Sequence, residues 1–273
     1  MQMLGRKSRQ TIVLLHDSAA GASSWDQVAS GLVASGHEIV RPELIGYGSS
    51  RPPSCCYKVS KEVLHLKSVI DDRAGGPLHL VGHGYGAFVA LHLRPALGRR
   101  VKSLTLVSPL VTSILKECGD KEADAEMDHL YRRFMSLSTH NESAAAFFVD
   151  HSRGEGTWQA MNADRRALIS SHIPKVRREM VALRADRSRL SWLSKSWVPA
   201  AVLIGENSRR FVRTTGWRLA EAFETDPISV EGAGHMIPAT HPEAVIAAIS
   251  RLTSVQIARR NASRSTAPII AAA

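Results

Sequence analysis

A glycine-rich turn at residues 80–87 has the clearest relation to chemistry in this sequence. It reads LVGHGYGA and lies between an apolar run and a segment with helical spacing. At such a strand-to-helix turn, the pattern G-x-S-x-G forms a nucleophile elbow that presents a serine hydroxyl to a pocket. Gly84 stands at the serine position. Because glycine has no side-chain atom that could attack a carbonyl carbon, residue 84 cannot form a covalent acyl-enzyme.

The flanking segments must position this turn. Short apolar runs predict buried strands, and apolar residues at helical spacing predict helices between them. The strands are expected at 11–16, 37–40, 78–81, 103–107, 200–204 and 228–230. Strands that alternate with helices indicate a mostly parallel sheet with helices on both faces, an α/β fold.

This alternation stops between residues 110 and 197, where the pattern is helical in character with a turn-rich break at Gly154 to Gly156. A helical insertion in an α/β chain is most simply a cap over the carboxyl ends of the strands, where ligands bind in open parallel sheets. We therefore expect a core at 1–109 and 198–255, a helical cap at 110–197 and a disordered tail at 256–273.

Five landmarks in chain order resemble the alpha/beta-hydrolase superfamily, in particular its small bacterial members of esterase or lipase type. The resemblance covers about residues 11 to 253 and implies the alpha/beta-hydrolase fold and an ancestry in ester, lactone or thioester hydrolysis. The landmarks are His16 with the small-residue loop before Trp25, Glu43 to Ser49, the glycine-rich turn, Val202 to Glu206, and Gly232 to Met236 followed by His241, Pro242 and Glu243.

The resemblance also implies which residues would complete a catalytic triad. The family places its histidine in a G-x-G-H motif, which His235 matches. Its acid in the common G-x-x-D pattern falls at Ser208, which cannot act as a carboxylate, and the position that some members use instead holds Ser108. Glu206 could substitute if its side chain turned inward. The sequence therefore indicates a degenerate triad.

The oxyanion site departs from the family pattern as well. Its donors would be the backbone N–H groups of Tyr85 and Ser18, and the usual His-Gly pair before this loop is His16-Asp17 here. Asp17 brings a negative charge beside the place where an oxyanion would form, which opposes the stabilisation that such a site provides.

We expect a protein without ordinary serine-hydrolase activity. As an alternative, His235 acts as a general base with backbone oxyanion donors, in hydrolysis by water or in a lyase or isomerase reaction.

The sequence argues against three further readings. Gly82, Gly84 and Ala87 satisfy G-x-G-x-x-A, the fingerprint of NAD(P)-binding oxidoreductases, but the next strand ends at Val107 without the required acid. A thiolate at Cys55 or Cys56 would need a lowered pKa and contact with the histidine. His79 and His83 lie on a strand and a turn, where their spacing does not form a metal pair. We expect neither cofactor nor metal.

Composition limits the partners. The 273 residues are 44% hydrophobic and carry a formal net charge of +10, but the arginines are scattered as pairs without interleaved aromatic residues. This pattern is typical of a solvated basic surface and argues against specific nucleic-acid binding. The apolar runs are far shorter than the ~18 residues that span a bilayer. We expect a cytoplasmic protein, independent of membranes, whose partner is a small apolar ester, lactone or thioester-like compound.

Overall fold

The fold was established from a computed structural model, which describes residues 10–54, 56–137, 139–194 and 198–265, with side chains through Ser254. In this part of the chain, six strands form one parallel sheet in the order β2-β1-β3-β4-β5-β6. They are β1 (Thr11–Leu15), β2 (Glu38–Val40), β3 (Leu78–His83), β4 (Val101–Val107), β5 (Ala200–Gly205) and β6 (Ile228–Val230). The predicted α/β fold class is confirmed.

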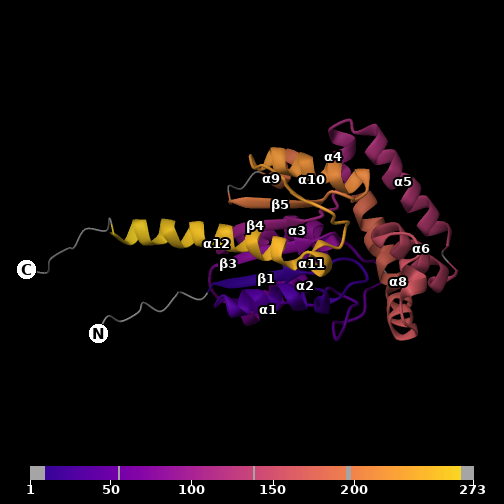
Figure 1. Ribbon diagram of the computed structural model, residues 1–273, viewed down its shortest axis with the longest axis horizontal. Helices are drawn as coiled ribbons and strands as arrows, with labels where there is room; N and C mark the ends of the chain where they lie inside the picture. The colour runs from indigo at the N-terminus through magenta and orange to yellow at the C-terminus, as the bar shows by residue number, and fades with distance from the viewer. Residues whose placement is uncertain (1–9, 55, 138, 195–197, 266–273) are drawn as a thin grey trace, which may run out of the picture.

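Apolar residues along the strands point alternately to the two faces of the sheet and pack into two hydrophobic layers, one on each face. Val13 and Leu15 of β1 pack into one layer, whereas Ile12 and Leu14 pack into the other, as the period of two of a strand requires. The first layer is covered by α2 (Val59–Arg73), α3 (Tyr85–Leu97) and α10 (Arg210–Ala222), and the second by α1 (Asp26–Ala34) and α12 (Pro242–Ser265). Both faces of the sheet are therefore buried (Figure 1).

A run of helices separates β4 from β5. Among the described residues these are α4 (Thr112–Glu117), α5 (Lys121–Ser136), α6 (Asn141–Arg153), α7 (Thr157–Ala160), α8 (Ala163–Ala185) and α9 (Leu190–Ser194). In Figure 1, α5, α6 and α8 lie together beyond one end of the sheet. Shorter helical turns elsewhere are η1 (Ala22–Trp25), η2 (Gly98–Arg100) and α11 (Ile237–Thr240).

The end of α12 differs from the expected disordered tail. The helix continues to Ser265, whereas we had expected disorder from residue 256. The added stretch contains Ala, Arg and Gln but no Gly or Pro, so nothing in it interrupts a helix. Residues 266–273 lie outside the described part of the chain.

The turn between β3 and α3 is packed too closely for side chains at two of its glycines. A Cβ at Gly82 would lie 2.4 Å from the carbonyl oxygen of Gly86, and a Cβ at Gly86 would lie 2.3 Å from the carbonyl oxygen of Leu15. Real Cβ contacts are never this short, so only glycine allows the start of α3 to approach β1 and β3. Gly84, between them, has a φ of +53°.

A buried ion cluster joins α8 to α2. The Lys175 ammonium lies 3.0 Å from a carboxylate oxygen of Glu62 and 3.0 Å from one of Glu179, and none of the three side chains is more than 3% exposed. Tyr57 donates a hydrogen bond to Glu62, and Tyr47 donates to Glu179. Because each charge has partners, the cluster is tolerated in a dry interior.

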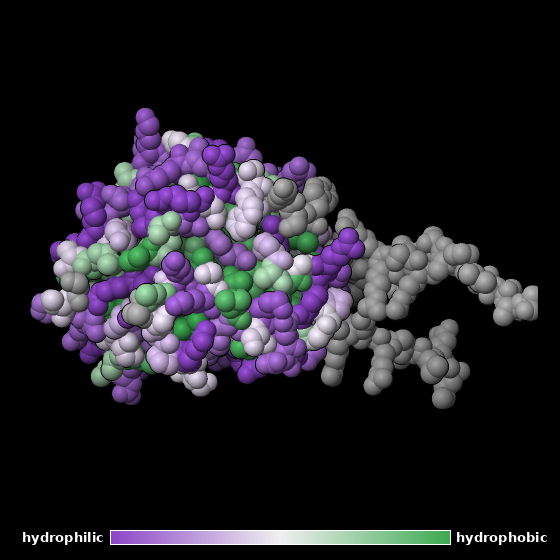
Figure 2. All heavy atoms as spheres, turned by 180° about the vertical axis from the view of Figure 1, so that it is seen from behind, coloured by the Kyte–Doolittle hydropathy of each residue, from purple (hydrophilic) through white to green (hydrophobic). Residues whose placement is uncertain are grey.

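The large exposed apolar side chains of the described residues come from five different helices, α1, α2, α8, α9 and α10. They are Val33, Leu64, Leu168, Val181, Trp192 and Trp217. On the face shown in Figure 2, apolar side chains are interspersed with hydrophilic ones. None of the helices in the described ranges has the length and apolar character that a membrane crossing requires.

We predict that Lys175→Met destabilises the protein by about 3–5 kcal/mol, because it leaves Glu62 and Glu179 buried without their cation. Urea unfolding at neutral pH measures the change. Lys67→Met is the matched control, since Lys67 pairs with Asp71 at the surface, and we expect it to stay within about 0.5 kcal/mol of wild type. Equal effects of the two substitutions would contradict the role assigned to the cluster.

Candidate functional site

The direction in which the chain adds strands to the sheet reverses between β1 and β3. These strands are neighbours, but the chain leaves β1 toward β2 on one side and returns to β3 on the other. Ligands of open parallel sheets bind at such a point of reversal. Asp17 lies in the loop after β1, and Gly84 directly follows β3. The topology thus brings these two residues together.

The Asp17 carboxylate lies in the space that a side chain at residue 84 would occupy. One of its oxygens, Oδ1, accepts a hydrogen bond from the backbone N–H of Tyr85 at 2.7 Å. The other, Oδ2, lies 2.9 Å from Nε2 of His235. A Cβ built on Gly84 would be only 2.0 Å from Oδ1. The carboxylate therefore occupies the space of a side chain at residue 84 and engages the backbone donor of the elbow.

Neighbouring backbone contacts hold the Asp17 loop in place. Nδ1 of His16 lies 2.8 Å from the carbonyl oxygen of Asp17, while Nε2 of the same ring accepts a hydrogen bond from the N–H of Leu44. Two residues further on, the N–H of Ala19 donates to the hydroxyl of Tyr47. The side chain of Asp17 is thus directed by a loop that is anchored on both sides.

Asp17 is ionised in this environment. Burial by itself would raise its pKa, but the nearby His235, the hydrogen bond with that ring and the N–H of Tyr85 all favour the charged form. Their combined effect holds the pKa of Asp17 well below its ordinary value. The site therefore contains a buried carboxylate that is negatively charged at neutral pH.

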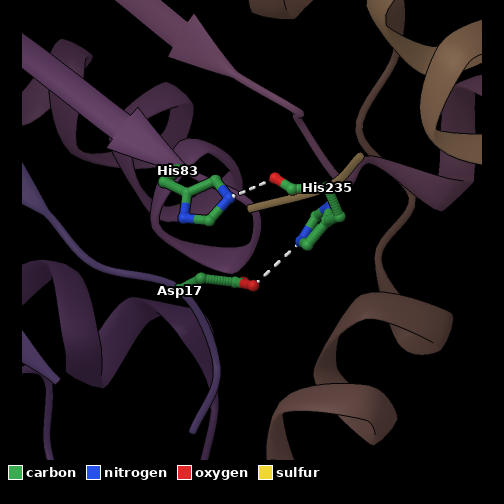
Figure 3. A group of neighbouring side chains, drawn as sticks. All are labelled: Asp17, His83 and His235. Carbon is green, nitrogen blue, oxygen red and sulfur yellow. Dashed lines mark hydrogen bonds and ion pairs between the residues drawn. The ribbon is translucent and has the colours of Figure 1, made fainter. Parts of the chain in front are cut away.

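His83 contributes a second imidazole to the site. Its Nε2 lies 2.8 Å from the backbone carbonyl oxygen of His235, to which it donates (Figure 3). Burial lowers the pKa of His83 to about 4, so the ring is neutral at pH 7, and its Nδ1 has no hydrogen-bond partner among the described residues. His83 thus holds the loop that carries His235. In the sequence, the position of His83 directly before Gly84 is the feature that could have indicated its place in the site.

Donor atoms of Asp17, His83 and His235 lie within 4.8 Å of one another. Three ligands of one zinc ion, with bonds of about 2.0–2.1 Å, would be only about 3.4 Å apart, so the side chains would have to move to bind a metal. The contacts present are a hydrogen bond between the Asp17 carboxylate and His235 and one from His83 to the backbone carbonyl of His235 (Figure 3). They account for this group without a metal.

Ser208 and Ser108 stand at the two positions expected for the acid, and neither supplies a carboxylate that could orient His235. Nδ1 of His235 and the hydroxyls of Ser208 and Ser108 are all buried, and none has a hydrogen-bond partner in the described ranges. The suggestion that Glu206 turns inward is wrong. Its side chain is exposed and accepts a hydrogen bond from the N–H of Gly232 at 3.1 Å, because the loop after β6 offers this donor on the outer side.

A cavity of about 840 Å³ lies next to the Asp17–His235 pair. Its walls include Asp17, Ser18 and His235 but, within the described chain, neither Gly84 nor Tyr85. The helices between β4 and β5 together with α10 supply half of the lining residues, and the apolar side chains of the wall include Leu110, Met127, Leu130, Phe148, Met180, Leu183 and Phe211. Cys56 is exposed and does not line it, and Cys55 lies outside the described residues.

Comparison with known proteins identifies the family. The model of the alpha/beta hydrolase family matches residues 12–248. The chain belongs to the alpha/beta hydrolase family. It is 29% identical to Lipase LipV of Mycobacterium tuberculosis over 111 residues, which cover 41% of this chain and 41% of the lipase. It is 25% identical to a haloalkane dehalogenase of Bradyrhizobium diazoefficiens over 173 residues, which cover 62% of this chain and 51% of that enzyme.

The chain thus matches about half or less of the length of these two relatives. Among solved structures, a hydrolase from Pseudomonas aeruginosa PA01 superimposes with a TM-score of 0.68 at 18% identity, covering 91% of each chain. This likeness supports the alpha/beta-hydrolase fold. The relatives include lipase-like and dehalogenase members of the family, so the resemblance seen in the sequence is confirmed.

A double-mutant cycle tests whether Asp17 fills the space at residue 84. We expect Gly84→Ala to destabilise the wild type by about 2–4 kcal/mol, because the methyl group would collide with the carboxylate and the backbone has a positive φ. In an Asp17→Ala background only the backbone strain remains, so the cost should fall to about 1 kcal/mol. Chemical denaturation of the four proteins measures the coupling; strictly additive effects would show that the two positions do not compete for space.

The lowered pKa of His83 predicts a pH-dependent stability. The folded protein keeps this ring neutral down to about pH 4, whereas the unfolded chain binds a proton near pH 6.5. Stability is therefore lost as the pH falls through this window. Relative to His83→Gln, the wild type should lose about 2–3 kcal/mol of unfolding free energy between pH 7 and pH 4.5. Urea titrations at both pH values measure the difference, and parallel losses in the two proteins would refute it.

Proposed function

We propose that this alpha/beta-hydrolase-fold protein binds a small apolar molecule in its cavity and lacks ordinary serine-hydrolase turnover. The observation that carries the proposal is the position of Asp17. Its carboxylate lies where a nucleophile's side chain would extend, and it accepts the N–H of Tyr85 and pairs with His235. A substrate carbonyl would have to displace this carboxylate from both partners to reach the elbow.

The remaining requirements of serine hydrolysis are also unmet. Gly84 supplies no attacking atom, and Nδ1 of His235 has no carboxylate partner among the described residues. A negative charge at the oxyanion donor disfavours the development of a second one there. These features act at separate steps of the reaction, namely attack, proton transfer and charge stabilisation, so no single replacement restores it.

The cavity supports the class of ligand. Pockets of about 300–1,000 Å³ with mainly apolar walls and a few polar groups are typical of small-molecule sites. The cavity of about 840 Å³ fits this description, with apolar side chains from the helical insertion opposite Asp17, Ser18 and His235. The similarity to a lipase agrees with a ligand related to esters, lactones or thioesters. In this proposal, residues 110–197 act as the cap that supplies the apolar wall.

A second candidate function is proton transfer by the Asp17–His235 pair. Both side chains are buried, and both line the cavity, which is the observation that favours an enzyme of hydrolase, lyase or isomerase type. His235 would act as the base. Its reaction could not use the N–H of Tyr85 for an oxyanion unless Asp17 first moved away.

The position of Asp17 also argues against the oxidoreductase alternative. A dinucleotide fingerprint places its pyrophosphate at the N-terminus of the helix that follows the glycine turn. In this chain that helix is α3, and the N–H of its first residue, Tyr85, is already bonded to an ionised carboxylate. The charge of Asp17 would repel a pyrophosphate.

Labelling and turnover test the proposed loss of serine-hydrolase activity. The wild type should show no covalent label with a fluorophosphonate probe and no hydrolysis of short p-nitrophenyl esters above His235→Ala. Gly84→Ser should remain poorly active, because Asp17 still engages the oxyanion donor and the acid is missing, a loss worth ~10⁴ in well-studied triads. The triple variant Gly84→Ser, Asp17→Gly, Ser208→Asp should gain probe labelling, because it supplies all three groups.

Labelling of the wild type would overturn the proposal. Turnover that is abolished by His235→Ala without any label would instead favour the second candidate, proton transfer by the pair. Circular dichroism of each variant checks that it is folded.

A further inference from the structure

Arg153 is a cavity-lining cation whose charge is not neutralised by a direct contact. It is the last residue of α6, and its side chain is half-buried in the wall of the cavity. Within the part of the chain that the structure describes, its guanidinium has neither a hydrogen bond nor an ion pair. A planar group with five N–H donors therefore borders the cavity without an acceptor.

The other charged groups of the cavity are already engaged. Asp17 is paired with His235 and with the N–H of Tyr85. Glu126 accepts a hydrogen bond from the N–H of Phe211 at 3.0 Å, and Arg210 forms an ion pair with Glu122.

Arg209, which also lines the cavity, is exposed to solvent and donates from Nε to the carbonyl oxygen of His151 at 3.3 Å. Arg153 thus differs from its neighbours: it is both partly desolvated and without a local acceptor.

This environment is unfavourable for a guanidinium that has no hydrogen-bond acceptor. Burial lowers the pKa of Arg153, repulsion from Arg165 adds to the effect, and the attraction of Asp17 opposes it. An arginine stays charged in proteins nonetheless, so the cost of its lost hydration must be met by an anion or by water. A ligand anion that accepted two of its N–H groups would remove this cost.

We propose that Arg153 is the anion-binding residue of the cavity, and that the ligand is a monocarboxylate with an apolar body. The apolar part would lie against side chains such as Met127, Phe148 and Met180, which line the same space. A carboxylate matches the planar fork of one guanidinium. A phosphate dianion fits less well, because the ionised Asp17 borders the same cavity and would repel the second charge.

This inference rests on the proposed small-molecule cavity but not on the absence of hydrolysis. It concerns which compounds bind, whereas labelling and turnover concern what happens to an ester at the elbow. Each can therefore fail while the other stands.

Matched pairs of acids and amides test the inference by isothermal titration calorimetry. Decanoate is compared with decanamide, and 4-phenylbutyrate with 4-phenylbutyramide, so that size and apolar surface are constant within each pair. The proteins are the wild type, Arg153→Gln, Arg153→Lys and Arg133→Gln. The last is the charge-matched control, since Arg133 is exposed in the last turn of α5 and does not line the cavity.

The wild type and Arg133→Gln should bind at least one acid about 10- to 100-fold more tightly than its amide, as expected for charge-assisted hydrogen bonds. Arg153→Gln should bind acid and amide within about threefold of each other, while Arg153→Lys should keep part of the preference because it keeps the charge. Equal binding of acid and amide by the wild type, a preference that survives in Arg153→Gln, or no binding of any acid at millimolar concentration would each overturn the proposal. The acid-amide comparison on the wild type does not depend on the folding of any variant.

Discussion

The hydrogen bond between the Asp17 carboxylate and the N–H of Tyr85 determines what this site can do. The first N–H groups of a helix have no partner within the helix, and Gly84, at the N-cap of α3, has no side chain to satisfy one. The carboxylate of Asp17 takes this role from a different loop and is favoured there by the helix dipole. A group that stabilises the start of α3 thereby engages the N–H that, in the function proposed above, would otherwise be open to an oxyanion.

The position of Asp17 depends in turn on buried polar groups that contact its loop, beginning with Tyr47. The hydroxyl of Tyr47 accepts the N–H of Ala19 and donates to Glu179, which is bonded to Lys175 of the same helix, α8. Buried polar networks of this kind are rigid when every member has its partners. The loop that carries Asp17 and the helix above it are therefore parts of one hydrogen-bonded unit, and the inner wall of the cavity is correspondingly well defined.

Sequence patterns predicted what depends on neighbours along the chain. The apolar runs located the strands, and the glycine turn after β3 and the G-x-G-H motif located Gly84 and His235. The patterns did not predict which donors each carboxylate would choose. Asp17 was expected only to lie near the oxyanion site, and Glu206 was considered as an inward acid, yet the N–H groups that these residues accept come from Tyr85 and Gly232, distant in sequence. Arg153 was missed because its significance is the lack of a partner in three dimensions, which no local pattern records.

The reason why residues 82 and 86 must be glycine differs from what distinguishes Gly84. Gly82 and Gly86 are required because the backbone of β1 and the start of α3 leave no room for a methyl group, and this holds whatever reaction takes place above them. A search that scores a strand-to-helix turn by its glycines therefore detects how closely a helix rests on a sheet, not whether a reaction occurs there. Proteins that share this scaffold will look alike to such a search, and the side chains that reach the middle of the turn from elsewhere are what distinguish them.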